Sequence, residues 1–163
     1  MLTGDMVDGS VADLGPHALP LRDLRTRYGA FMCLGNHDYY SGSDRWTQFW
    51  THQTGIVVLR NEHVSVSIKP PLETPTSGRE AALLMVAGVI DPDVRLEEGH
   101  AKPDPHEAVS RPYPTSPNPS PLTAYHLKLM LAHNPKLSAQ VAAAGFNLQL
   151  SSHTHAGQFL PWT

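Results

Sequence analysis

Cysteine is almost absent from the 163-residue sequence, because Cys33 is the only one, and this excludes an internal disulfide and a zinc cluster built on several thiolates. Positive charge is also scarce, since twelve Lys and Arg stand against fifteen Asp and Glu for a net charge of -3. Without a local cluster of Lys and Arg, we expect no nucleic-acid-binding patch. The longest apolar run, residues 81–90, is too short for a transmembrane helix, and no signal-peptide pattern opens the sequence.

The composition that remains is that of a folded domain. Hydrophobic residues make up 40% of the chain and charged residues 17%, which provides apolar material for a core. The length suits a single domain over residues 1–163. Fifteen prolines disfavour a helical bundle, and eight of them fall within residues 91–121. We therefore expect a proline-rich surface insertion at about 92–121, extended or disordered.

Hydrophobic periodicity predicts strands that alternate with helices. Short apolar or alternating runs predict strands at 30–34, 56–59, 63–68, 81–90, 125–131 and 146–150, with a loop at 70–79. Helical spacing predicts helices at 11–27 (two helices, or one kinked at Pro20), at 44–54 between an N-cap at Ser43 and a stop at Gly55, and at 137–144 before Gly145. This alternation indicates a layered α/β domain.

Polar residues that can bind metals follow four of these predicted strand ends. They are Asp5, the pair Asn36 and His37, then His133, and finally His153 and His155. Ligand sites of α/β proteins are built at such strand ends, so we expect these side chains to meet at one edge of a sheet. Imidazole nitrogens with carboxylate and amide oxygens suit zinc, iron or manganese.

Several of these residues stand in longer motifs. Gly4-Asp5, Gly35-Asn36-His37-Asp38, His133 and His153-Thr154-His155 resemble the ordered motifs of the calcineurin-like metallophosphoesterases. The strings at 3–9, 132–135 and 152–158 resemble the branch that includes membrane-tethered metallophosphoesterases. The resemblance covers nearly the whole chain except the proline-rich insertion.

This resemblance implies a four-layer α/β/β/α sandwich, incomplete at both ends, and hydrolysis of a phosphate mono- or diester by a metal-bridging hydroxide. Two divalent ions (Mn, Zn or Fe) are implied as cofactors. The resemblance implies that Asp5 bridges the two ions and that His155 binds the first of them. The second ion would be bound by Asn36, His133 and His153. His37 would donate a proton, and Asp38 would orient His37.

The sequence also departs from the family. The first motif, an Asp-x-His, is absent, because only residues 1–3 precede Gly4-Asp5, and the later strands of the second sheet are absent too. Ser152 and Ala156 stand where this branch has glycine. We therefore expect a fragment of a longer parent, with one well-held metal ion and impaired activity. Localisation stays open at this point, because any membrane tether of the parent would lie upstream of Met1. The alternative is a non-catalytic module that keeps the fold and binds a protein partner.

Other residues carry weaker expectations. Asp8 either supports the site or belongs to a turn, and Asp91 is interpreted as an Asp-Pro turn rather than a cleft residue. The spacing of Trp46, Phe49 and Trp50 predicts core packing, and Cys33 is expected to be buried and inert. The remaining histidines, namely His17, His52, His63, His100, His106 and His126, are expected on the surface or in packing roles.

Overall fold

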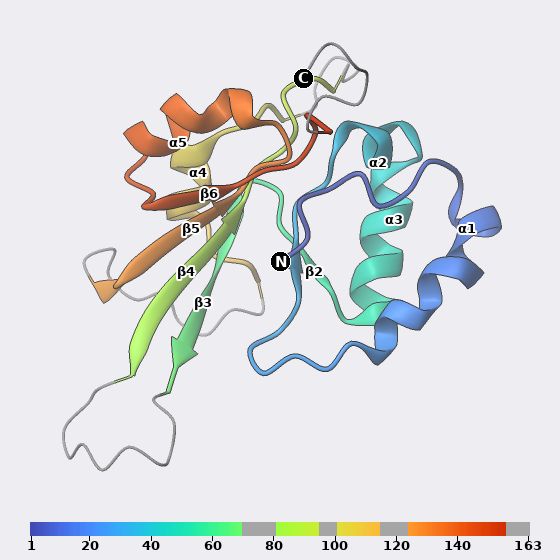
Figure 1. The fold of residues 1–163 in the computed structure, drawn as a ribbon, viewed down its shortest axis with the longest axis horizontal. Helices are drawn as coiled ribbons and strands as arrows, with labels where there is room; N and C mark the ends of the chain where they lie inside the picture. Colours follow the sequence, from blue (N-terminus) through green and yellow to red (C-terminus); the bar gives the residue numbers. More distant parts are fainter. Residues whose placement is uncertain (70–80, 95–100, 115–123, 156–163) are drawn as a thin grey trace.

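The computed structural model describes residues 1–69, 81–94, 101–114 and 124–155, and these build four layers of secondary structure (Figure 1). A small sheet and a four-stranded sheet lie face to face at the centre, with helices on the outer face of each. The predicted α/β/β/α arrangement is confirmed.

The small sheet pairs with the N-terminal segment that leads to Asp5. Its strands are β1 (Phe31–Met32) and β2 (Val57–Val58), which pair in parallel, and Leu2 adds a parallel bridge to Met32. Successive residues alternate between its two faces, because Phe31 and Cys33 pack toward the large sheet while Met32 and Leu34 pack toward the helices. Cys33 is fully buried, and burial raises the pKa of its thiol. Because the thiolate is the reactive form, this agrees with the prediction that Cys33 is inert.

Helices cover the outer face of the small sheet. They are α1 (Val11–Ala18), a 3-10 turn (Leu19–Asp23), α2 (Asn36–Tyr40), α3 (Ser43–Phe49) and a π-helical turn (Trp50–Thr54). The hydroxyl oxygen of Ser10 accepts the amide N–H of Asp13 and caps α1, and Pro20 lies in the 3-10 turn that follows. The predicted break near Pro20 is confirmed.

The predicted helix at 44–54 is present as α3 and the π-helical turn. Its N-cap is Gly42, which has a φ of +97°, so the prediction of Ser43 as N-cap is wrong by one residue. Gly55, with a φ of +72°, ends the helix as predicted. Trp46 and Trp50 are buried and stack with ring centroids 5.2 Å apart, which confirms their predicted core role.

The large sheet has the strand order β3-β4-β5-β6. Its strands are β3 (Glu62–Ile68), β4 (Ala82–Gly88), β5 (Leu127–Leu131) and β6 (Leu148–Leu150). β3 and β4 are antiparallel, whereas β4, β5 and β6 run parallel. The carboxyl ends of β4, β5 and β6 therefore lie at one edge of the sheet.

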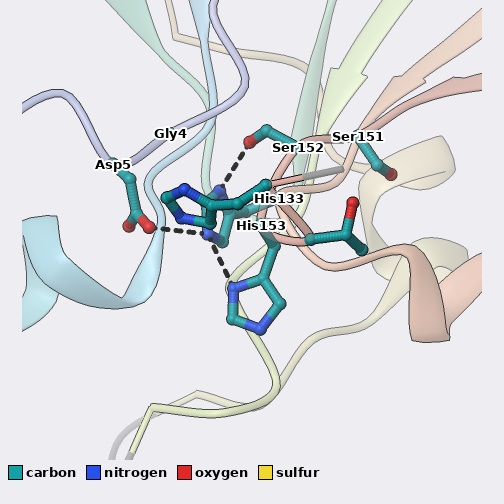
Figure 2. A pocket seen from close by; sticks show the side chains of 8 residues that line it. Gly4, Asp5, His133, Ser151, Ser152 and His153 are labelled. Carbon is teal, nitrogen blue, oxygen red and sulfur yellow. Dashed lines mark hydrogen bonds and ion pairs between the residues drawn. The ribbon is translucent and has the colours of Figure 1, made fainter. Parts of the chain in front are cut away.

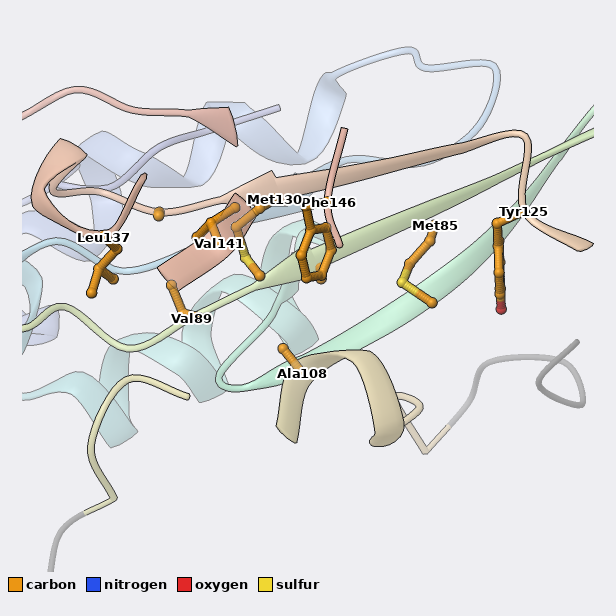
Figure 3. Close-up of a cluster of buried hydrophobic side chains, with 10 residues drawn as sticks. Met85, Val89, Ala108, Tyr125, Met130, Leu137, Val141 and Phe146 are labelled. Carbon is orange, nitrogen blue, oxygen red and sulfur yellow. The ribbon is translucent and has the colours of Figure 1, made fainter. Parts of the chain in front are cut away.

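The outer face of the large sheet packs on a second helical layer, and Figure 3 shows the core between them. The helices are α4 (Pro105–Ser110), a 3-10 turn (Pro135–Leu137) and α5 (Ser138–Ala143). Met85 and Ala87 of β4 point into this core, whereas Val86 points toward the small sheet. Ala108 of α4 and Val141 of α5 complete the core from the helical side.

The prediction that residues 92–121 are extended or disordered is wrong for the segment that forms α4. The carboxylate of Asp104 accepts the amide N–H groups of His106 and Glu107, and Pro105 occupies the first helical turn, where proline is tolerated. Ala108 is fully buried against the large sheet. Prolines surround this short helix but do not interrupt it, so proline density over the wider window misled the prediction.

Some predictions fall outside the described residues. These are the loop at 70–79, the prolines at 117–121, His100, and the end of the last motif from Ala156 to Gln158. Across the described ranges, no helix is both long and apolar enough to cross a membrane.

Candidate metal centre

Three predicted ligands from distant parts of the chain meet in the structure (Figure 2). Asp5 follows the Leu2 segment, while His133 and His153 follow the carboxyl ends of β5 and β6. Nε2 of His133 lies 3.1 Å from Oδ2 of Asp5 and 3.1 Å from Nδ1 of His153. The three ligand atoms lie within 4.8 Å of one another, which is close enough for one ion to contact all of them.

The buried ring of His133 is held in place through Nδ1, the ring nitrogen other than the one that faces Asp5. Its Nδ1–H donates to the carbonyl oxygen of Thr3 at 2.7 Å. Since a carbonyl can only accept, Nδ1 carries a proton, and Nε2 is the ring nitrogen that faces Asp5 and His153. The hydroxyl of Ser152 donates to the same carbonyl and lies 2.9 Å from Nδ1 of His133. The serine that replaces the family's glycine thus adds a second contact that orients this ring.

The backbone around the three side chains is in an unusual conformation. Asp5, His153 and His155 have φ angles of 54°, 69° and 52°, in the left-handed region that side chains other than glycine rarely adopt. Asn61 is the other non-glycine residue of this kind in the described ranges. Such conformations cost free energy and concentrate at functional sites, which supports a functional role for these loops.

Gly35 allows the close approach of Asp5 to His133. A Cβ at position 35 would lie 2.2 Å from Oδ1 of Asp5 and 2.7 Å from Cε1 of His133. Either contact is far shorter than non-bonded atoms tolerate. The glycine before Asn36 is therefore required for space between two of the converging side chains.

Asp38 has a different role from the predicted one. Its buried carboxylate accepts the amide N–H groups of Gly35, Asp5, Met6 and Val7 at 2.8–3.2 Å. Burial raises the pKa of Asp38, while the hydrogen bonds from the four amides lower it. The carboxylate therefore fastens the Asp5 loop to the start of α2 and does not orient His37.

The carboxylate that contacts His37 belongs to Asp8, whose Oδ1 lies 3.4 Å from Nδ1 of the ring. This contact favours the supporting role for Asp8 over the turn alternative. The His37 side chain is 48% exposed, and its amide N–H donates to Oδ1 of Asp5 at 3.0 Å. His37, Asp8 and Asp5 line one cavity of about 300 Å³ together with Met6, Val7 and His155.

Asn36 lies between Gly35 and His37, which both adjoin the Asp5 carboxylate. Its Oδ1 is buried and has no hydrogen-bond partner among the described residues. A buried oxygen without a partner costs free energy, and coordination of a cation would satisfy it. The converging set of Asp5, His133 and His153 offers a carboxylate oxygen and two imidazole nitrogens, which suits a divalent zinc, manganese or iron ion.

His155 is placed near this group but is not part of its closest set. The exposed side chain lines the cavity that contains His37 and also a neighbouring cavity that contains His133 and His153. It does not join the three ligand atoms that lie within 4.8 Å of one another. The structure thus brings Asp5, His133 and His153 together and leaves His155 at the rim.

Sequence reasoning missed Asp93. Its Oδ2 accepts hydrogen bonds from Nδ2 of Asn134 at 2.7 Å and from Nζ of Lys136 at 3.0 Å. The same oxygen lies 3.6 Å from Nε2 of His153. The hydrogen bond from Lys136 is the main cause that lowers the pKa of Asp93. The sequence held one signal for this residue. The Asp-Pro-Asp string at 91–93 follows a buried strand, and that strand runs parallel to the one that precedes His133.

Asp91, the other aspartate of that string, is buried. Its Oδ1 accepts the amide N–H of Asp93 at 2.8 Å, which confirms the turn interpretation. Its Oδ2 has no partner among the described residues, and burial raises the pKa of this carboxyl group.

Comparison with known proteins gives one consistent result. A family model described as calcineurin-like phosphoesterase matches residues 1–157. A transmembrane protein with metallophosphoesterase domain from Danio rerio is 30% identical over 168 residues, which cover 100% of this chain and 34% of that protein. The protein of the same name from Bos taurus is 29% identical, and the match covers 99% of this chain and 34% of that protein.

A bacterial relative is also similar along the chain. An uncharacterized metallophosphoesterase from Campylobacter jejuni is 26% identical over 162 residues, which cover 99% of this chain and 36% of that protein. The chain thus spans about a third of the length of these relatives.

Proposed function

Because the chain belongs to the calcineurin-like phosphoesterase family, a family of metal-dependent phosphoester hydrolases, we propose that it binds one divalent ion at Asp5, Asn36, His133 and His153 and hydrolyses a phosphate mono- or diester. The observation that carries the proposal is the convergence of the Asp5, His133 and His153 ligand atoms within 4.8 Å. The buried, unpartnered oxygen of Asn36 supports its inclusion as the fourth ligand.

The protein residues prepare the site before any ion binds. A divalent ion held there supplies positive charge to the phosphoryl oxygens and lowers the pKa of water in the site. The hydrogen bond from His133 to Thr3 holds the ring so that Nε2 faces Asp5. The four amides on Asp38 fix the backbone that presents Asp5. The donor atoms therefore need little reorganisation, which favours tight binding.

His37 is proposed as the proton donor to the leaving oxygen of the ester. The ring is at the cavity that Asp5 also lines, and its half-exposed position leaves room for substrate. Asp8 faces Nδ1, so the proton would move from Nε2 to the departing alkoxide oxygen. Loss of this group is expected to slow hydrolysis while leaving metal binding intact.

A second ion would be held less well by the described residues. Oδ1 of Asp5 already accepts the amide N–H of His37, and His155 is the other predicted ligand. A catalytic zinc site usually has about three protein ligands, so this pair falls short. We propose that the chain binds one equivalent of zinc or manganese tightly and that its turnover is correspondingly impaired. Calorimetric titration that finds two tight equivalents would contradict this.

The test of function is hydrolysis of p-nitrophenyl phosphate and bis-p-nitrophenyl phosphate with added manganese, zinc or iron. His133→Ala is expected to lose both metal binding and turnover, whereas His37→Ala is expected to lose turnover alone. His106→Ala is the matched control, because His106 is exposed on α4. If the wild-type chain binds metal but its turnover does not exceed that of the His133→Ala variant, the protein-interaction alternative is favoured instead.

Attachment to a membrane is a further proposal. It is supported by the names of the Danio rerio and Bos taurus relatives, both called transmembrane proteins. Fractionation of cells that express the full-length protein tests it, since an attached protein stays in the pellet after alkaline carbonate extraction. Release into the supernatant would contradict the proposal.

A further inference from the structure

We propose that Asp93 is a positioning residue for the metal centre, because its carboxylate sets the orientation and tautomer of the His153 ring. The inference rests on the proposed metal site and adds to it a residue outside the ligand set. Carboxylates that contact the far nitrogen of a metal-binding histidine commonly fix the ring in this way.

The geometry around His153 carries the inference. Nδ1 of its ring faces His133 at 3.1 Å, on the side where the ligand atoms converge. The opposite nitrogen, Nε2, lies 3.6 Å from Oδ2 of Asp93. A carboxylate on that side favours the tautomer with its proton on Nε2, which leaves the Nδ1 lone pair for the ion.

Asp93 itself is held on several sides, so it can act as a fixed support. Nδ2 of Asn134 donates to Oδ2 at 2.7 Å, and Nζ of Lys136 contacts both carboxylate oxygens at 3.0–3.2 Å. Its amide N–H donates to Asp91, and its carbonyl accepts the hydroxyl of Tyr40. Asp93 is thus tied by its carboxylate to the loop that follows β5 and by its backbone carbonyl to α2.

These contacts connect two separate ligand loops. Asn134 and Lys136 come directly after the ligand His133, and His153 lies on the loop that follows β6. One carboxylate therefore ties the His153 ring to the loop that begins after His133. His153 has a φ of 69°, a conformation that its surroundings must stabilise, and a fixed partner for its ring contributes to that.

The first experiment measures zinc and manganese affinity of the wild-type chain and of Asp93→Asn by isothermal titration calorimetry. The substitution keeps the shape but removes the charge, and we expect affinity about tenfold weaker. Asp44→Asn is the matched control, because Asp44 is an exposed aspartate that pairs with Arg60 at 2.7 Å. Circular dichroism melts of each variant establish that it is folded.

The second experiment distinguishes positioning from general stabilisation. Long-range ¹H–¹⁵N NMR of the zinc-loaded protein reports which ring nitrogen of His153 faces the ion and which carries the proton. We expect the proton on Nε2 in the wild type and a mixture of the two arrangements in Asp93→Asn. In a His153→Ala background, Asp93→Asn is expected to cause no further loss of affinity, since Asp93 acts through the missing ring.

The outcomes separate the two proposals. A wild-type chain that binds no metal overturns the proposed function and this inference with it. Wild-type binding together with unchanged affinity in Asp93→Asn overturns the inference alone. A further loss of affinity in the His153→Ala background also overturns it, because Asp93 would then act on the site by another route.

Discussion

Replacement of Gly35 by alanine tests the geometry of the metal centre without removal of any ligand. The added methyl group would lie 2.2 Å from Oδ1 of Asp5, 2.6 Å from its amide nitrogen and 2.7 Å from Cε1 of His133. The carboxylate must therefore move by about 1 Å, which exceeds the roughly 0.5 Å that a preorganised site tolerates. We expect metal affinity to fall at least about tenfold, as for the loss of a supporting contact.

The same substitution should also destabilise the fold, because overpacking costs about 1–3 kcal/mol. Gly55→Ala is the control, since Gly55 has a φ of +72° and no atom within 4 Å of an added Cβ. It should cost about 1 kcal/mol from backbone strain and leave metal affinity unchanged. Urea denaturation and calorimetric titration measure both effects. Gly35→Ala with wild-type affinity would refute the reasoning.

Three other predictions concern single contacts. Asp38→Asn should lower the free energy of unfolding by about 3 kcal/mol, because an amide cannot accept all four N–H groups; an effect in urea denaturation below about 1 kcal/mol would contradict this. Ser152→Ala should weaken metal binding only about threefold in calorimetric titration, since Thr3 still holds the His133 ring. Burial raises the pKa of Glu62, so its folded form retains the proton more tightly and its contribution to stability falls as pH rises above about 4.3. Glu62→Gln should therefore gain stability relative to wild type between pH 4 and pH 7 in urea denaturation, and an opposite trend would exclude this explanation.

The sequence predicted those parts of the molecule that depend on local pattern. Alternation in the segment that became β3 and the apolar run that became β4 identify the large sheet. The motifs placed Asp5, His133 and His153 at strand ends, and the structure brings these three together. Pattern sufficed because parallel strands deliver their carboxyl ends to a common edge.

Other parts depend on contacts that local pattern does not encode. The role of Asp38 depends on amides about 30 residues away in sequence, so adjacency to His37 was a poor guide to its partner. α4 forms within a proline-rich window because Asp104 caps it and Ala108 packs on the large sheet. Asp93 acquires its contacts only when the loops after β5 and β6 meet.

The most direct test of the metal centre is anomalous diffraction from crystals of this chain grown with manganese. We predict a strong peak at about 2.2 Å from the donor atoms of Asp5, His133 and His153, with Asn36 completing the set. The peak should be absent from His133→Ala crystals. A wild-type crystal in which manganese binds elsewhere, or not at all, would contradict the account.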